Sequence, residues 1–209
     1  MMLRRRYAGK RASAAAAGIT RSAYTTGFAD GPIATPAFSA GDFLLIVHAN
    51  DEFNQNNVPT GWNAGPRAGS QSPNAWLDVF WKIATGTETY PISVNGLHYM
   101  GVYKNASTLI WSAGNINLMG PGTDAQIPAY NGAPAGSWLF RAFTARVAQT
   151  EAHMDAVLGP IVPLAKRFGS LSSGAFGDSN GILTDIAQTN TTITGSDPKV
   201  AMTFAITPA

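Results

Sequence analysis

Two apolar segments bounded by turn residues dominate the pattern of hydrophobic and polar positions along the chain. The first is Phe43–Val47, which follows Gly41-Asp42, and the second runs from Ala75 to Ala84. Both are short for helices, so the pattern predicts two central strands of one sheet. Alternation along the second segment places apolar side chains on both of its faces. A strand of this kind is expected to be covered on both sides, by neighbouring layers or by an oligomer contact.

Weaker signals of the same kind predict the other strands. Asn180-Gly181 predicts a hairpin turn, because both residues tolerate positive φ. Residues 151–158 fit either a short helix or a strand, and Gly159-Pro160 ends that element in either case. The segment 50–74, between the two central strands, is expected to be a long loop. Further strands are expected near residues 23–40 and over 90–94, 97–104, 108–113, 125–129, 137–145, 161–168, 174–178, 182–187, 188–195 and 200–206.

Composition agrees with a fold of many short strands. Only 12% of the residues are charged, and 22 Gly and 13 Pro supply many turns, which argues against surface helices. Turn signals recur roughly every 8–12 residues, as in sandwiches and jelly rolls. The chain has no Cys, so it has no disulfides and no thiolate metal sites. We therefore expect an all-β fold: an antiparallel, jelly-roll-like β-sandwich over residues 23–209, with an extended basic N-terminal arm over residues 1–22.

Positive charge is concentrated in this arm. Five of the 14 basic residues lie within the first eleven positions, so the rest of the chain holds nine basic residues against 12 acidic ones. The Ala- and Ser-rich stretch that follows is too weakly apolar for a secretory signal; a transit peptide or a solvated tail are further alternatives. We expect the arm to bind a neighbouring subunit or, as the second choice, nucleic acid. Its expected contact residues are Arg4, Arg5, Arg6, Tyr7, Lys10 and Arg11.

Two groups that contain histidine have the composition of catalytic or metal sites. His48, Asp51 and Glu52 lie where a central strand leaves the sheet, and such a set can bind a metal or transfer protons. A polar loop after the strand is the favoured interpretation. His153 and Asp155 would share one face of a strand, where a surface ion pair is favoured over a site.

Residues 177–181, together with Asp185, are rich in oxygen ligands. They lack the spacing and the terminal Glu of an EF-hand, so a turn stabilised by Asp and Asn side chains is favoured over a calcium site. The sequence has no nucleophile elbow of the Gly-x-Ser-x-Gly type and no phosphate-binding glycine loop before a helix. We therefore expect no enzyme activity and assign no catalytic, metal-binding or cofactor-binding residues and no cofactor.

The tryptophans are candidates for stacking on a bound sugar. Flat aromatic side chains stack on sugars in glycan-binding sandwiches, although burial in the core or in an interface is favoured for most of them. Trp62, beside the Asn-rich segment 50–74, is the expected contact if the chain binds a glycan. The five tryptophans are Trp62, Trp76, Trp81, Trp111 and Trp138.

The order of short motifs along the chain is similar to that of jelly-roll modules in bacteriophage structural proteins, including tail-fibre and head-decoration components. The resemblance covers roughly residues 30–209 and leaves out the basic arm. It implies a virion building block and supplies no catalytic residues. The motifs are Gly41-Asp42 with the apolar run after it, Pro59-Thr60-Gly61-Trp62, Val79–Gly86 with Glu88, the strand that ends at Tyr103, Gly177-Asp178 with Gly181, and Ala201–Ala209.

These observations lead to one expected function and two alternatives. We expect a phage virion structural protein, a capsid decoration (cement) or tail-associated subunit, located in the virion. Its expected partners are other virion proteins and copies of itself, bound through the arm and the sheet faces; no apolar run approaches the ~20 residues of a membrane span, so no membrane partner is expected. The alternatives are a host-surface glycan-binding module of a tail or head fibre, and a depolymerase, which would need two carboxylates about 5–9.5 Å apart in a groove.

Overall fold

Most of the chain is placed by the computed structural model, but the segment with the expected arm contacts is not. Arg4, Arg5, Arg6, Tyr7, Lys10 and Arg11 lie outside the described residues, as do Asp51 and Glu52. The described residues are 17–29, 31–50, 57–71, 74–93, 95–168, 173–195 and 197–209.

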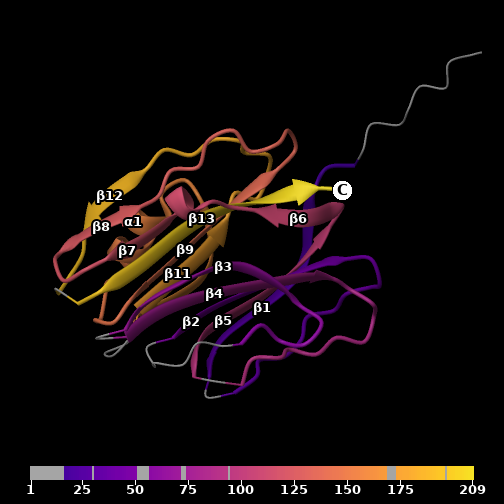
Figure 1. Cartoon of the computed structure of the whole chain (residues 1–209), viewed down its shortest axis with the longest axis horizontal. Coiled ribbons are helices and arrows are strands. Elements are labelled where there is room, and N and C mark those ends of the chain that lie inside the picture. The colour runs from indigo at the N-terminus through magenta and orange to yellow at the C-terminus, as the bar shows by residue number, and fades with distance from the viewer. Residues whose placement is uncertain are drawn as a thin grey trace, which may run out of the picture.

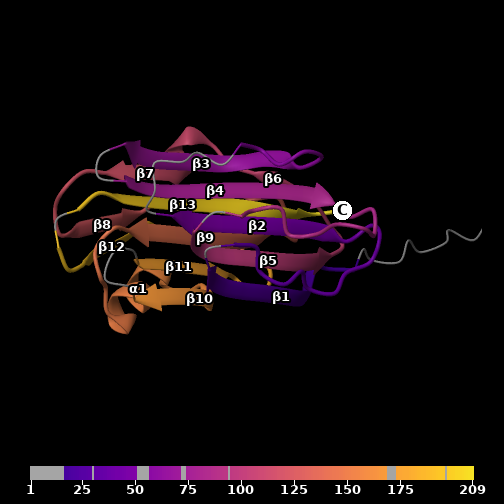
Figure 2. The same cartoon turned by 90° about the horizontal axis from the view of Figure 1, so that it is seen from below.

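Two antiparallel sheets packed face to face form the body of the protein (Figures 1 and 2). The all-β, antiparallel β-sandwich predicted from the sequence is therefore confirmed. The first sheet has the order β1 (Thr20–Ala29), β5 (Gly96–Lys104), β2 (Phe43–Asn50), β4 (Asn74–Ile83) and β3 (Asn63–Gln71). The second has the order β10 (Val162–Phe168), β11 (Ser173–Asp178), β9 (Trp138–Ala145), β13 (Lys199–Pro208) and β6 (Ala106–Ile110), and β7 (Ile116–Met119) also pairs with β13.

The main core lies between the sheets, where alternate side chains of each strand meet. The Phe140 ring stacks on that of Phe204 at 4.9 Å between centroids, and lies 5.5 Å from the ring of Tyr99 in the opposite sheet. The two expected central strands, β2 and β4, pair directly, with Phe43 opposite Ile83. In this core, β2 buries Phe43, Leu45 and Val47 completely, and β4 buries Leu77 and Val79.

The outer face of the first sheet is also buried, as the two-sided apolar pattern predicts. Residues of the same chain bury this face: Tyr90 and Ile92 pack with Leu44 and Met100 in a separate buried cluster. Residues 90–93 alternate because they lie on this face, and they are not the strand that their pattern predicts. An oligomer contact is therefore not needed to bury the second face of these strands.

A third layer covers the outer face of the second sheet. It consists of a small sheet, β8 (Asp124–Ile127) with β12 (Thr189–Thr192), the helix α1 (Glu151–Leu158) and the 3₁₀ turn η1 (Ala113–Asn115). Arg141 on β9 connects this layer to the second sheet. Its buried guanidinium donates hydrogen bonds to the carbonyls of Leu158 and Ala187 and to the Thr189 hydroxyl. Burial lowers the pKa of Arg141 to about 10. In the described part of the chain, neither helix is long and apolar enough to span a membrane.

The segment 151–158, which fits helix or strand in sequence, is a helix. The Thr150 side chain accepts a hydrogen bond from the backbone N–H of His153 and caps its first turn. Gly159 ends it at a positive φ of 61°. Thr is a preferred residue at the start of a helix, and Gly159 takes a positive φ that residues with a side chain rarely adopt.

Two other local predictions are wrong. Residues 63–71 form β3, although they belong to the segment 50–74 expected to be a loop; the strand carries Gly65-Pro66 at a shift of register and Gly69 opposite Trp76. Asn180 has the expected positive φ of 47°, but residues 182–187 do not pair with β11 as a hairpin. Instead Ile186 bridges to Tyr130 and joins the third layer.

Candidate functional site

The outer strands β1 and β10 lie on the same side of the sandwich and form its candidate contact surface (Figure 2). The guanidinium of Arg167 on β10 lies over the ring of Phe28 on β1, which joins the two sheets at this side. Within the described chain, β1 pairs only with β5 and β10 only with β11. Each strand therefore presents a second edge whose backbone N–H and C=O groups have no strand beside them.

The edges of the sandwich differ in how well they are protected against pairing with another chain. β3 and β10 carry Pro66 and Pro163, each at a shift of register, and β6 and β7 have five and four residues. Proline, bulges and shortness all discourage strand addition. β1 has ten residues, no Pro, and a single charged side chain, that of Arg21. Its one shift of register lies near its start, between Arg21 and Ala23, and its pairing is regular from Ala23 to Ala29. It is therefore the longest and least protected edge that the structure describes.

Exposed apolar side chains gather on these two strands. Tyr24 and Phe28 on β1 are 47% and 43% exposed, and Val162 and Phe168 on β10 are 40% and 47% exposed. Apolar side chains beside an open edge are typical of a surface that another protein covers. We call Tyr24, Phe28, Val162, Phe168 and the free edge of β1 the β1–β10 edge.

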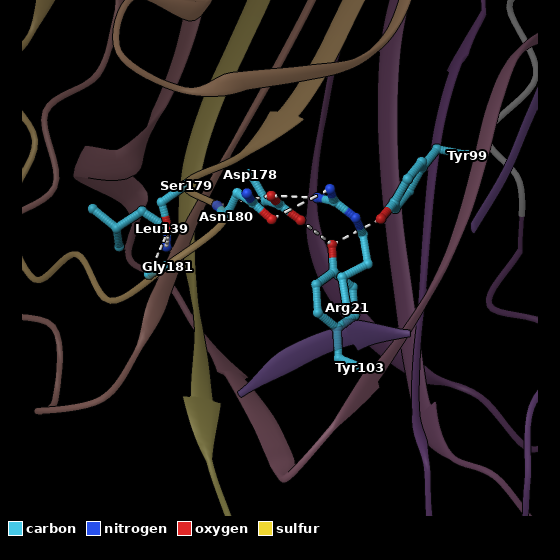
Figure 3. Close-up of polar contacts among 8 residues, drawn as sticks. All are labelled: Arg21, Tyr99, Tyr103, Leu139, Asp178, Ser179, Asn180 and Gly181. Atoms are coloured by element: carbon cyan, nitrogen blue, oxygen red, sulfur yellow. Dashed lines mark hydrogen bonds and ion pairs between the residues drawn. The ribbon is translucent and has the colours of Figure 1, made fainter. Parts of the chain in front are cut away.

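Arg21 does not add its charge to this edge, because it is paired inside the protein (Figure 3). Its Nη1 lies 2.5 Å from Oδ1 of Asp178, which is fully buried at the end of β11 in the other sheet. The Tyr103 hydroxyl donates to Oδ2 of Asp178 at 2.8 Å, and the Tyr99 and Tyr103 hydroxyls are 2.7 Å apart. The backbone N–H of Asn180 donates to Oδ1 of Asp178. We call Arg21, Asp178, Tyr103 and Tyr99 the inter-sheet network.

The network keeps its groups in fixed protonation states. Burial opposes the charge of Arg21, but the hydrogen bond and the charge of Asp178 outweigh it and raise the pKa of Arg21. Burial, then the neighbouring Tyr99 and Asp178, raise the pKa of Tyr103 well above its ordinary value. Burial and the charge of Asp178 likewise raise the pKa of Tyr99. Near neutral pH, a charged Arg21 and a neutral Tyr103 therefore bind Asp178 and join β1 and β5 to β11.

This arrangement also accounts for the oxygen-rich segment 177–181. Both carboxylate oxygens of Asp178 accept hydrogen bonds from protein donors, as described above. Asp185 accepts from the backbone N–H of Gly132 and from the Thr184 hydroxyl. The Ser179 hydroxyl donates to the carbonyl of Gly181, which tightens the turn. These contacts match the turn interpretation rather than a calcium loop.

His48 lies on β2, away from solvent, and is fully buried. Its ring stacks on that of His98 at 4.6 Å, and His98 Nδ1 is 2.7 Å from the Tyr90 hydroxyl. Asp78 Oδ2 is 4.0 Å from His48 Nδ1, and Asp78 Oδ1 accepts from Arg67 at 2.8 Å. No spacing in the sequence predicts this group, whose members come from β2, β3, β4, β5 and the segment between β4 and β5. Their burial favours a structural role for His48.

His153 and Asp155 do not form a joint site. They lie on α1, where His153 Nδ1 is 3.0 Å from Gln149 Oε1 and Asp155 accepts from Lys166 at 2.8 Å. Among the residues that the structure describes, no three His, Asp or Glu side chains are grouped as metal ligands.

Trp62, the expected glycan contact, lies in a half-buried position beside an ion pair. The Lys82 ammonium is 5.9 Å from the centroid of its ring and 2.8 Å from Oε1 of Glu88. Burial opposes ionisation of Glu88, but hydrogen bonds from Lys82 and Thr85 outweigh it and hold the pKa of Glu88 far below its ordinary value. The surroundings of Trp62 are therefore charged, and part of its ring packs on the outer cluster of the first sheet.

Comparisons of the chain with protein-family models, with curated proteins and with solved structures found no match.

Proposed function

We propose that the chain is a structural subunit of a bacteriophage particle, a capsid decoration or tail-associated protein that binds neighbouring virion proteins. The observation that carries the proposal is the β1–β10 edge. A ten-residue edge strand without Pro, which carries the exposed Tyr24 and Phe28, is a template for strand addition. The motif order described above supplies the phage context.

Charge and topology support the arm as the second contact. The last of the basic residues before position 12, Arg11, lies nine positions before Thr20, where β1 begins, so a partner that pairs with β1 is close to them along the chain. Arg21 is paired with Asp178, so its charge is held inside the protein and does not face the edge. Partner binding would therefore combine an apolar, backbone-paired edge with a separate basic segment. The neighbour can be another copy of the chain or a different virion protein.

The proposal assigns no catalytic step to the protein. The buried carboxylates of Asp78 and Asp178 each pair with an arginine, Arg67 and Arg21. Removing either partner of such a buried pair leaves an uncompensated charge, so these carboxylates are held in place by the fold. This chemistry fits a scaffold subunit.

Replacing Tyr24 and Phe28 together with Lys is expected to lower the number of copies retained on assembled particles by about tenfold or more. Two lysines on an edge strand repel a partner strand and remove two apolar contacts, and a loss of about 1.4 kcal/mol already lowers an affinity tenfold. Quantitative mass spectrometry of purified particles measures the copy number.

The matched control is Ile182→Lys, because Ile182 is 67% exposed and lies outside the β1–β10 edge. We expect this variant to be retained normally, and thermal melting checks that both proteins fold. Deletion of residues 2–16 tests the arm in the same assay. Normal retention of the Tyr24/Phe28 variant would reject the edge as the contact surface.

A further inference from the structure

A second surface feature lies away from the β1–β10 edge: an open groove of about 670 Å³ between the 110–117 and 128–131 segments. Small-molecule sites commonly have volumes of roughly 300–1,000 Å³. The residues that matter for its chemistry are Trp111, Asn115, Asn117, Tyr130, Asn131 and Gln188.

The floor of the groove is held in place by hydrogen bonds within the protein. Asn115 Oδ1 accepts from the backbone N–H and the hydroxyl of Ser112, at 3.0 and 2.9 Å. Its Nδ2 donates to the carbonyl of Ala129 at 3.0 Å, which ties the 110–117 segment to the 128–131 segment. Tyr130 is fixed by its bridge to Ile186 and by a hydrogen bond from its hydroxyl to the carbonyl of Ile110. The groove is therefore formed before any ligand arrives.

The lining combines neutral hydrogen-bonding groups with one accessible indole. Asn117 and Gln188 each donate one amide N–H to a protein acceptor, which leaves their side-chain carbonyl oxygens available as acceptors. Asn131 is exposed, and its amide makes no hydrogen bond to the part of the chain that the structure describes. Trp111 is 36% exposed at the same groove.

The absence of charge from this lining narrows the class of ligand. None of the twelve residues that line the groove is Asp, Glu, Lys, Arg or His. Recognition of a phosphate or carboxylate would call for Arg or Lys, and a cation would call for carboxylates. Amide groups that donate and accept, beside a flat aromatic ring, match a molecule with many hydroxyl groups and an apolar C–H face.

We propose that this groove binds a neutral saccharide. The sugar ring stacks against Trp111, and its hydroxyl groups bond to the amides of Asn117, Asn131 and Gln188. This places glycan binding at Trp111, whereas the sequence pointed to Trp62, whose neighbours Lys82 and Glu88 are charged. The site lies outside the β1–β10 edge, so the saccharide proposal and the assembly proposal stand or fall separately.

The experiment measures binding of the whole chain to a panel of neutral gluco-, galacto- and manno-oligosaccharides by saturation-transfer NMR and tryptophan fluorescence. Sialyllactose serves as the anionic probe. Trp111→Ala and Asn131→Ala are the test variants, and Trp62→Ala is the matched aromatic control. Melting temperatures check the fold of each variant.

We expect at least one neutral oligosaccharide to bind, with affinity reduced about tenfold or more in Trp111→Ala, reduced in Asn131→Ala, and unchanged in Trp62→Ala. The proposal would be overturned by no binding of any neutral probe at millimolar concentration, by binding that survives Trp111→Ala, or by binding confined to sialyllactose. Loss of binding in Trp62→Ala alone would move the site to Trp62 and also overturn it.

Discussion

Replacing Asp178 with Ala is expected to lower the free energy of unfolding by about 3–5 kcal/mol, because it breaks a buried ion pair by removing one partner. Asp178 is fully buried, and Arg21 is only 14% exposed at its side chain. The variant leaves the Arg21 guanidinium and the Tyr103 hydroxyl without their shared acceptor between the two sheets. Urea unfolding of the purified chain measures the loss.

Two variants make this result specific to the network. Tyr103→Phe removes only the hydroxyl hydrogen bonds, so we expect a smaller loss of about 1 kcal/mol. Glu151→Gln removes an exposed carboxylate that pairs with Lys166, and surface pairs of this kind contribute less than about 1 kcal/mol. If Asp178→Ala is no more destabilising than Glu151→Gln, the network does not lock the sheets together.

The second large effect is a loss of stability at alkaline pH. Burial raises the pKa of Tyr90 well above its ordinary value, and the pKa values of Tyr99 and Tyr103 are raised as well. In the unfolded chain these tyrosines lose their protons near pH 10, whereas the folded chain keeps them protonated. The folded state then binds more protons, so its stability is fully present below about pH 10 and falls as the pH rises further.

The expected slope is about 1.4 kcal/mol per pH unit for each tyrosine, and roughly 4 kcal/mol per pH unit for the three together. Arg141, whose pKa is lowered to about 10 in the folded state, contributes about 1.4 kcal/mol per pH unit in the opposite direction, so the net slope is about 3 kcal/mol per pH unit. Urea unfolding at a series of alkaline pH values measures it, and absorbance titration follows ionisation of the phenols. Tyr103→Phe should make the slope shallower by about 1.4 kcal/mol per pH unit, the contribution of one tyrosine. Ionisation of all the tyrosines near pH 10 without unfolding would contradict the burial of these side chains.

The central strands could be predicted because their pattern is local. Phe43–Val47 and the segment from Ala75 to Ala84 are apolar without interruption, and they became the paired strands β2 and β4. β3 was missed because its residues lack this pattern: Gly65-Pro66 disturbs the pairing, and the β4 residue Trp76 packs over Gly69. Its place in the sheet is set by β4, which a local pattern cannot reveal.

The inter-sheet network could not be predicted for a related reason. Arg21 falls within the range 1–22 that charge assigned to the arm, yet β1 begins at Thr20. Its partner Asp178 lies 157 positions later, so no spacing in the sequence connects the two. The groove had a weak signal, since Trp111 is followed closely by Ser112, Asn115 and Asn117, but its other wall comes from residues 128–131.

The central claim is that β1 pairs with a neighbouring subunit in an assembled particle. Amide hydrogen exchange of Thr20–Ala29, in the isolated chain and in purified particles, measures this pairing directly. We expect the amides on the free edge of β1 to exchange at least about tenfold more slowly in particles, because a partner strand then accepts their hydrogen bonds. Equal exchange rates for β1 in the two states would contradict the account.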